Sequence, residues 1–253
     1  MEVHPWLALP AGVAIAAVAS AVGIGGGVLW MPLLLLAWGL SPETAVLTSL
    51  LIQCVGMGSG AVAYARNRLV DLRLALVILA FAVPGLVVGA WLARRLGEGD
   101  MELLLGILVM FSAFLFVSSN ERYGDVGEER VPPARMLPYS WVVTLGSVGS
   151  GMLSTAIGEW LVPVMRSRLS LRMTNAIATC ILVTLANCVV AALAHFAMGS
   201  GANYELVAWA VPGVIVGGQI GPWVTKRIDE RKLKEVFIFV LTLVGIHLVY
   251  NAY

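Results

Sequence analysis

Long apolar segments alternate with short polar ones along the whole chain. Eight windows contain no Asp, Glu, Lys or Arg: 3–42, 44–65, 74–93, 103–120, 136–158, 173–204, 206–225 and 236–253. Most of them reach about the 18–20 residues that an α-helix needs to cross a hydrocarbon core of roughly 30 Å. The pattern predicts an all-α polytopic membrane protein.

Composition supports this prediction and narrows the class of protein. Hydrophobic residues make up 59% of the 253 positions and charged residues only 12%, with a mean hydropathy of +0.89. Soluble domains carry about a quarter charged residues, so soluble enzymes and disulfide scaffolds are excluded. The net charge of +1 gives no reason to expect a nucleic-acid partner. The three cysteines all lie in apolar windows, and we expect no metal or cofactor.

The sequence contains an internal repeat. The stretch 27–32 (GVLWMP) reappears as 158–163 (GEWLVP), at a sequence offset of 131. Further along, 84–89 (PGLVVG) match 212–217 (PGVIVG) at an offset of 128. Duplication of this kind is typical of secondary transporters, whose substrate sites lie between the repeats near the middle of the membrane.

The repeat predicts how the chain is organised. A first membrane repeat covers 1–118, a polar linker 119–137 and a second membrane repeat 138–253. Each half would hold one glycine-broken helix and three transmembrane helices. The broken segments, 5–38 and 138–168, are too long for one span and too short for two. Each could be a re-entrant hairpin or a discontinuous helix.

The distribution of basic residues favours re-entrant segments. If both segments re-enter, all sixteen Lys and Arg fall on one side of the membrane except Arg94 and Arg95. The positive-inside rule prefers this arrangement to eight plain spans. Three true spans per half would invert the second repeat relative to the first and place both termini on the side opposite the basic residues.

The glycine run 23–27 (GIGGG) is a candidate anion site. The helix that resumes after it would present free N–H groups and the positive end of its dipole, which favour an anion. Gly25, Gly26 and Gly27 would let a ligand approach the backbone closely. The competing interpretation is a packing break that lets helices cross.

Hydroxyl and amide side chains follow each break. Thr48, Ser49 and Gln53 lie in the first half, and Asn175 and Thr179 hold matching places in the second. They could complete a cage of neutral donors around an oxyanion. Alternatively they make ordinary interhelical hydrogen bonds, worth about 0.6 kcal/mol on average in membranes.

Glu159 is an acidic residue inside an otherwise uncharged segment, next to Gly158 at the second break. Ionisable side chains inside a membrane are costly, so a functional role is the first hypothesis. Two roles stay open: carrying a proton that couples transport, and accepting hydrogen bonds from the broken backbone.

Two stretches, 23–35 and 45–50 (AVLTSL), resemble the hallmark of the sulfite exporter TauE/SafE family, also called the 4-toluene sulfonate uptake permease family. Its pattern, G-x-GGG-x4-P-x-L followed by A-x-x-TS, normally occurs once per half. The resemblance implies a multi-pass permease of the bacterial inner membrane that moves sulfite or an organosulfonate. The second half departs from the pattern, reading STAIG at 154–158 and TCI at 179–181. The two half-sites are therefore chemically unequal, and Gly158 and Thr179 match less closely.

The leading hypothesis is a secondary transporter, not an enzyme, that moves a small sulfur-containing anion by alternating access. Protons or the membrane potential would supply the energy, because no GxxxxGK nucleotide loop is present. The alternatives are an anion channel and an intramembrane enzyme. The enzyme is disfavoured because residues 148–151 (VGSG) do not form the GxSG pattern of a rhomboid-like protease.

Overall fold

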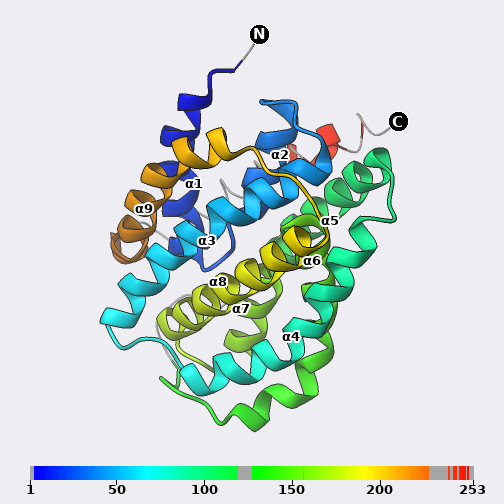
Figure 1. Cartoon of the computed structure of the whole chain (residues 1–253). Coiled ribbons are helices and arrows are strands. Elements are labelled where there is room, and N and C mark those ends of the chain that lie inside the picture. The colour runs from blue at the N-terminus through cyan, green and yellow to red at the C-terminus, as the bar shows by residue number, and fades with distance from the viewer. Residues whose placement is uncertain are drawn as a thin grey trace.

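The computed structural model describes residues 3–118, 127–155 and 157–227, together with 239, 242, 243, 245–248 and 250. Within these residues the chain is helical, which confirms the all-α prediction, and four apolar helices are long enough to cross a membrane. The α-helices are α1 (Ala8–Val22), α2 (Gly27–Leu36), α3 (Pro42–Arg66), α4 (Leu72–Ala93), α5 (Glu98–Ser118), α6 (Ser140–Leu153), α7 (Gly158–Ser167), α8 (Met173–Ala197) and α9 (Tyr204–Arg227) (Figure 1). The protein is therefore a multi-pass membrane protein.

Local sequence signals set the helix boundaries. α3 begins with Pro42 at its first position and Glu43 in its first turn, which suit the free N–H groups and positive dipole of a helix start. At the start of α4, the Asp71 side chain accepts a hydrogen bond of 3.2 Å from the Leu74 amide. This is an N-cap, which supplies a partner to one of the amides that a helix start leaves unpaired.

Left-handed backbone positions recur at a fixed distance along the chain. Three residues with positive φ in the first half each have a counterpart at the offset of 131: Gly23 and Ser154, Gly39 and Ser170, Arg68 and Gly199. Each pair contains one glycine and one other residue. The other residue adopts the left-handed conformation at a cost of roughly 1–2 kcal/mol. The chain therefore turns at equivalent places in both halves.

Two helices form the centre of the bundle. α3 and α8 lie side by side in Figure 1, and 67% of each helix's most apolar window is buried, against 44% for α4. They run antiparallel, because Asn175 at the start of α8 donates to the Leu69 carbonyl just beyond α3 (2.9 Å). At the opposite end, Ser200 beyond α8 donates to Glu43 at the start of α3 (3.0 Å). We call these the Leu69 end and the Glu43 end of the bundle.

Each broken segment packs along a helix of the other half. α1 runs parallel to α9, and a Cβ placed on Gly213 or Gly217 would lie 2.1 or 2.4 Å from the carbonyl oxygens of Leu9 or Val13. α6 runs parallel to α4 in the same manner, with Gly85 and Gly89 facing its backbone. Small residues allow such close approach between membrane helices.

The two broken segments are helical hairpins that enter from opposite ends. α1 starts at the Glu43 end beside α9, and α2 leads back to the start of α3 at that same end. α6 starts at the Leu69 end beside α4, and α7 leads back to the start of α8 there. Neither hairpin crosses the bundle as one straight helix.

Part of the predicted linker lies across the Leu69 end, and we call residues 127–132 the strap. Residues 119–126 lie outside the described residues, and the stretch that follows forms a single β-bridge between Glu128 and Leu171. A 3-10 helix, η2 (Pro133–Tyr139), then leads into α6. The strap thus contacts the loop that precedes α8.

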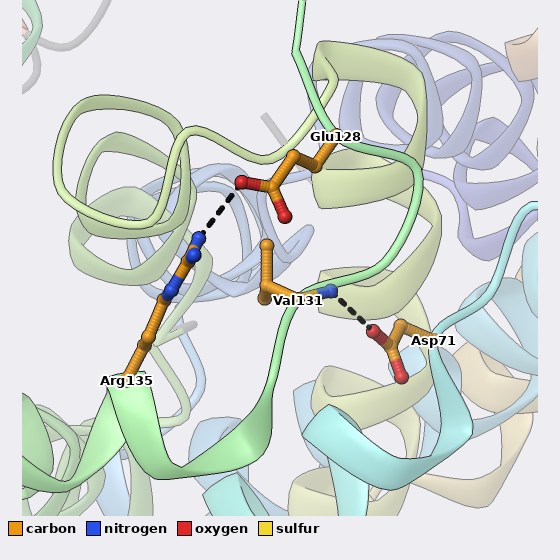
Figure 2. A network of polar contacts seen from close by, with 4 residues as sticks. All are labelled: Asp71, Glu128, Val131 and Arg135. Atoms are coloured by element: carbon orange, nitrogen blue, oxygen red, sulfur yellow. Dashed lines mark hydrogen bonds and ion pairs between the residues drawn. The ribbon is translucent and has the colours of Figure 1, made fainter.

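Asp71 fixes this strap to α4. Figure 2 shows its carboxylate accepting from the Val131 amide at 3.2 Å, beside an ion pair of 2.8 Å between Arg135 and Glu128. The ion pair is about half exposed, so it adds little, since exposed pairs contribute about 0–1 kcal/mol. Asp71 itself is buried, and its carboxylate provides the stronger attachment.

Candidate functional site

The two breaks meet in the middle of the bundle. A Cβ placed on Gly27 would lie only 1.7 Å from the Ser154 carbonyl oxygen, and one on Gly158 would lie 2.5 Å from the Gly23 carbonyl oxygen. Side-chain atoms cannot approach a carbonyl so closely. Glycine at 27 and 158 is therefore required for the backbones of the two hairpins to touch.

A buried polar cluster lies at this crossing, made of Gly27, Ser49, Gln53 and Ser154; we call it the Gln53 cluster. The Gly27 amide donates to Gln53 Oε1 at 2.9 Å. Gln53 Nε2 donates to Ser154 Oγ at 2.8 Å, to the Ser154 carbonyl at 3.1 Å and to Ser49 Oγ at 3.1 Å. The two serine hydroxyls are also 3.1 Å apart. One glutamine therefore joins α2, α3 and the end of α6.

The Gln53 cluster is a neutral group of hydrogen-bond donors. It offers a primary amide, two hydroxyls and the first backbone amide of α2, whose dipole places partial positive charge there. In the present arrangement these donors bind one another. An oxyanion could replace the internal acceptors, because hydroxyls rotate and the Gln53 amide can change its partners.

The second break carries less polarity. Cys180 and Thr184 occupy the places on α8 that Ser49 and Gln53 occupy on α3, again at the offset of 131. A Cβ on Gly158 would lie 3.2 Å from Cys180 Sγ, and Cys180 Sγ lies 4.0 Å from the Thr184 hydroxyl. Sulfur is a weak hydrogen-bonding partner. The unequal chemistry expected from the sequence is thus present at the crossing.

Similarity to known proteins identifies the family. The chain matches the family described as "Sulfite exporter TauE/SafE" over residues 8–248. It belongs to the TauE/SafE family.

Curated relatives are named as transporters. The chain is 23% identical to the probable membrane transporter protein YunE of Bacillus subtilis, over 92% of this chain and 93% of the relative. It is 23% identical to the probable membrane transporter protein YfcA of Escherichia coli K12, over 90% and 84% of the two chains. A probable membrane transporter protein, ORF9 of a Sinorhizobium species, is 29% identical over about half of each chain. No solved structure matches the chain significantly.

The two threonines of the family motif lie outside the Gln53 cluster. Thr48 Oγ1 accepts from the Asn203 amide at 2.9 Å, in the loop before α9 at the Glu43 end. Thr179 Oγ1 accepts from the Asp71 amide at 3.0 Å, in the loop before α4 at the Leu69 end. Each hydroxyl therefore fastens the N-cap of a helix from the other half. These two contacts are equivalent and lie at opposite ends.

The other predicted site residues are divided between the crossing and the Leu69 end. Gly25 and Gly26 are buried within the first break, beside Gly27. Asn175 lies toward the Leu69 end, where its amide donates to Leu69, away from the cluster. Glu159 is the second residue of α7, but its side chain is outside the described part of the structure, so its role stays a prediction.

Three residues that form these contacts have no feature in the sequence that marks them as functional. Ser154 was part of the departing STAIG stretch, and only its offset of 131 from Gly23 marks it as a turn residue at the crossing. Asp71 and Asn203 are the N-caps that the threonines bind, and their separation along the chain exceeds the repeat offset by one position. In this TauE/SafE protein, the repeat offset could have marked Ser154 as the counterpart of Gly23, whereas the N-caps Asp71 and Asn203 carry no such mark.

Proposed function

We propose that this protein is a secondary transporter that moves a small sulfur-containing anion, such as sulfite or an organosulfonate, across the bacterial inner membrane. The observation that carries the proposal is the meeting of two broken helices at a buried cluster of neutral donors. The family description names sulfite, which suits such a site.

The anion binds at the crossing. The starts of α2 and α7 both point their dipoles toward this region, since α2 begins at Gly27 and α7 at Gly158. The amide of Gln53 and the hydroxyl of Ser49 complete the site from α3. Gly25 and Gly26 let the anion approach the backbone of the first break.

The two halves, 1–118 and 138–253, are inverted repeats joined by the linker 119–137. Three observations support this: left-handed residues recur at an offset of 131, α1–α9 packing is matched by α6–α4 packing, and the hairpins enter from opposite ends. Inverted repeats give a transporter two equivalent gates.

Thr48 and Thr179 act in those gates rather than as anion ligands. The hydrogen bond from Asn203 to Thr48 closes the Glu43 end, and the one from Asp71 to Thr179 closes the Leu69 end. Breaking one while the other persists would open the crossing to a single side, which is the requirement for alternating access. Both bonds are present in this structure, which supports a state in which neither end is open.

The test uses the purified full-length protein in proteoliposomes. Vesicles loaded with unlabelled sulfite should accumulate labelled sulfite by counterflow, and external methanesulfonate, sulfate and phosphate would show which anions compete. A carrier predicts saturable counterflow. Conductance far above carrier turnover would instead favour the anion channel, and absence of any uptake would contradict transport of these anions.

A further inference from the structure

One face of α8 carries a stripe of residues that leads from the crossing to the Glu43 end. Residues spaced three and four apart lie on one face of a helix. The stripe consists of Cys180, Thr184, Asn187, Ala191 and His195. Cys180 lies against Gly158, and His195 contacts the Gly151 carbonyl, so the stripe follows the second hairpin.

His195 has one ring nitrogen engaged and one without a partner. Its Nε2 lies 2.7 Å from the Gly151 carbonyl oxygen. A carbonyl only accepts hydrogen bonds, so Nε2 carries the hydrogen and a neutral ring has its lone pair on Nδ1. The residue is only 2% exposed, and within the described part of the chain Nδ1 has no hydrogen-bond partner.

The first half shows that this contact does not require histidine. Tyr64 is the counterpart of His195, and its hydroxyl donates to the Ser20 carbonyl at 2.9 Å. Ser20 and Gly151 are likewise related by the offset of 131. A tyrosine thus makes the equivalent hydrogen bond, while His195 adds a second nitrogen that can bind a proton.

Asn187 lies on the same stripe, between His195 and the crossing. It is 1% exposed, and neither its Oδ1 nor its Nδ2 has a partner among the described residues. Leaving such a group unpaired costs about 1–3 kcal/mol. Buried polar atoms of this kind mark positions for bound water or a passing ligand. Its counterpart on α3 is Gly56, so the first half has no equivalent amide.

Charged groups surround the histidine from two other elements. Within the described residues, the charges that act on the imidazole are Glu43 at the start of α3 and Arg94 at the end of α4, and α6 contributes the Gly151 carbonyl. Glu43 is exposed, and it accepts a hydrogen bond from Ser200. An acidic group exposed to water therefore lies at the same end of the bundle as the buried imidazole.

We propose that Nδ1 of His195 is a proton-binding site that couples proton movement to anion transport, with Asn187 and water connecting it to the crossing. This inference rests on the proposed transport function. A proton from solution at the Glu43 end binds the Nδ1 lone pair, giving an imidazolium with both nitrogens protonated. Its positive charge offsets part of the anion's charge inside the membrane. The same proton leaves Nδ1 when the anion is released.

The experiment compares proton movement with sulfite movement in proteoliposomes that hold a pH-sensitive dye. The variants are His195→Gln and His195→Tyr, and the second recreates the arrangement of Tyr64 with its hydrogen bond to a carbonyl. Tyr64→Phe is the matched control. The acid–base chemistry of sulfite is the same in every preparation and cancels in the comparison.

Wild type and Tyr64→Phe should move protons together with sulfite. In both His195 variants, the proton movement that accompanies sulfite should be lost, because neither side chain offers an imidazole nitrogen that can bind the proton. Sulfite counterflow at equal pH on both sides should persist, because it needs no net proton movement. A misfolded variant would lose sulfite counterflow as well as proton movement. The His195→Tyr variant is the better protected of the two against misfolding, because it can keep the hydrogen bond to the Gly151 carbonyl.

A spectroscopic readout tests the site without transport. The protein has three histidines, and the ¹⁵N NMR signals lost in His195→Gln identify residue 195. We expect a hydrogen on Nε2 and a bare Nδ1 at high pH, and hydrogens on both at low pH. A ring that stays neutral down to the pH at which the protein unfolds would overturn the inference.

The outcomes separate the two proposals. Wild-type vesicles without sulfite counterflow would overturn the transport proposal and this inference with it. Counterflow in wild type, with unchanged protons per sulfite in both His195 variants, would overturn only the role of His195. Glu159 would then be the next coupling residue to examine.

Discussion

The two breaks have similar backbones but different side chains. At the first, Gly27 contacts the Gln53 cluster, in which a glutamine and two serines share several hydrogen bonds. At the second, Gly158 faces Cys180 and Thr184. The two breaks therefore share the turn and the close approach, while the polar side chains are concentrated on one side of the crossing.

This difference separates two requirements on the same site. The hairpins must touch, which fixes glycine at 27 and 158 whatever the substrate. Under the proposed function, the donors that face the anion can differ between the halves, because the close approach of the hairpins does not depend on them. Substitutions at the crossing should accordingly divide into those that damage folding and those that damage binding.

Gly27→Ala should have the largest effect. Its Cβ would lie 1.7 Å from the Ser154 carbonyl oxygen and 2.8 Å from Gln53 Nε2. The backbone must move, and overpacking of this kind costs about 1–3 kcal/mol or more. We expect a markedly lower thermal unfolding midpoint in detergent and no sulfite counterflow.

Two other glycines at the breaks provide the comparison for this variant. Gly26→Ala is the control for stability alone, because its nearest contact, Trp30 Cδ1 at 3.2 Å, is a side-chain atom. Gly158→Ala should fall between the two, since its Cβ would meet the Gly23 carbonyl at 2.5 Å. Equal stability of all three variants would show that the hairpins are not in firm contact.

Gln53→Leu should have the next largest effect, and it should exceed that of Thr184→Val at the equivalent place. Leucine leaves the Gly27 amide and the Ser154 hydroxyl with fewer partners, which costs about 1–3 kcal/mol for each buried group left unpaired. It also removes an anion donor. In the counterflow assay, we expect the concentration of unlabelled sulfite that halves the uptake of labelled sulfite to rise about tenfold or more. This corresponds to a loss of about 1.4 kcal/mol in binding free energy.

Thr184→Val is the matched control, because the only hydrogen-bond geometry seen at that hydroxyl in the described structure is the long contact with Cys180. Its sulfite competition should change less than about threefold, well under 1 kcal/mol. If the two variants weakened sulfite binding equally, the anion would lie symmetrically between the halves, and the one-sided site would be wrong.

The two breaks can be predicted from the sequence, because they depend on local residues, and α2 and α7 begin at Gly27 and Gly158. Gly27 and Gly158 are followed by prolines at matching positions, and this pattern defines the offset of 131 directly. The meeting of the breaks was not predictable, since it joins segments that are distant along the chain. The hydrogen bond from Gln53 to Ser154 is one such contact.

The alignment of α4 with α9 shows a second limit of prediction from the sequence. Sequence comparison paired Gly89 with Gly217, but the structure gives Gly85 and Gly217 equivalent contacts, to the carbonyls of Thr144 and Val13. The alignment was displaced by four residues, or one helical turn. Glycines in both helices recur every four residues, so both registers fit the pattern and only the packing against α6 and α1 decides.

The partners of the two threonines were also beyond local reasoning. The motif predicts Thr48 and Thr179 either as donors around an anion or as partners in interhelical hydrogen bonds, and the structure shows their hydroxyls accepting from the amides of Asn203 and Asp71. Nothing in the motif indicates that a loop from the other half reaches these hydroxyls. Their place in the gates, rather than at the anion, is an interpretation that the next substitutions test.

Thr48→Val and Thr179→Val should have moderate effects at opposite ends. Each removes the acceptor of a backbone amide, which costs about 1–3 kcal/mol where the amide is buried, as at Asp71, and less where it is half-buried, as at Asn203. Cys180, buried at the crossing, serves as the reporter after Cys54 and Cys188 are replaced by alanine. A membrane-impermeant thiol reagent should reach it faster from the Glu43 end in Thr48→Val and from the Leu69 end in Thr179→Val.

The control for this pair is the double variant. Opening both ends together should make Cys180 reactive from either side and should let sulfite leak without saturation. Faster labelling from the same side in both single variants would contradict gates at opposite ends, and with it the alternating-access mechanism.

Asp71→Asn should have the smallest effect. It tests why the N-cap of α4 is an aspartate while that of α9, Asn203, is an asparagine. Asn203 caps α9 through its own Oδ1, which accepts from Leu206 at 3.1 Å. Asp71 caps α4 in the same way but uses its second oxygen for the Val131 amide of the strap (Figure 2). Asparagine is as good a cap as aspartate, so only the bond to the strap is lost, at about 1 kcal/mol.

Hydrogen exchange distinguishes these two parts of the Asp71 contact. In Asp71→Asn the Val131 amide should exchange about fivefold faster, the equivalent of about 1 kcal/mol, while the Leu74 amide in α4 stays protected. Asn203→Asp, which has no strap to hold, should leave the exchange of Leu206 unchanged. Faster exchange at Leu74 would mean that the charge of Asp71, and not its second oxygen, is what the first half needs at this position.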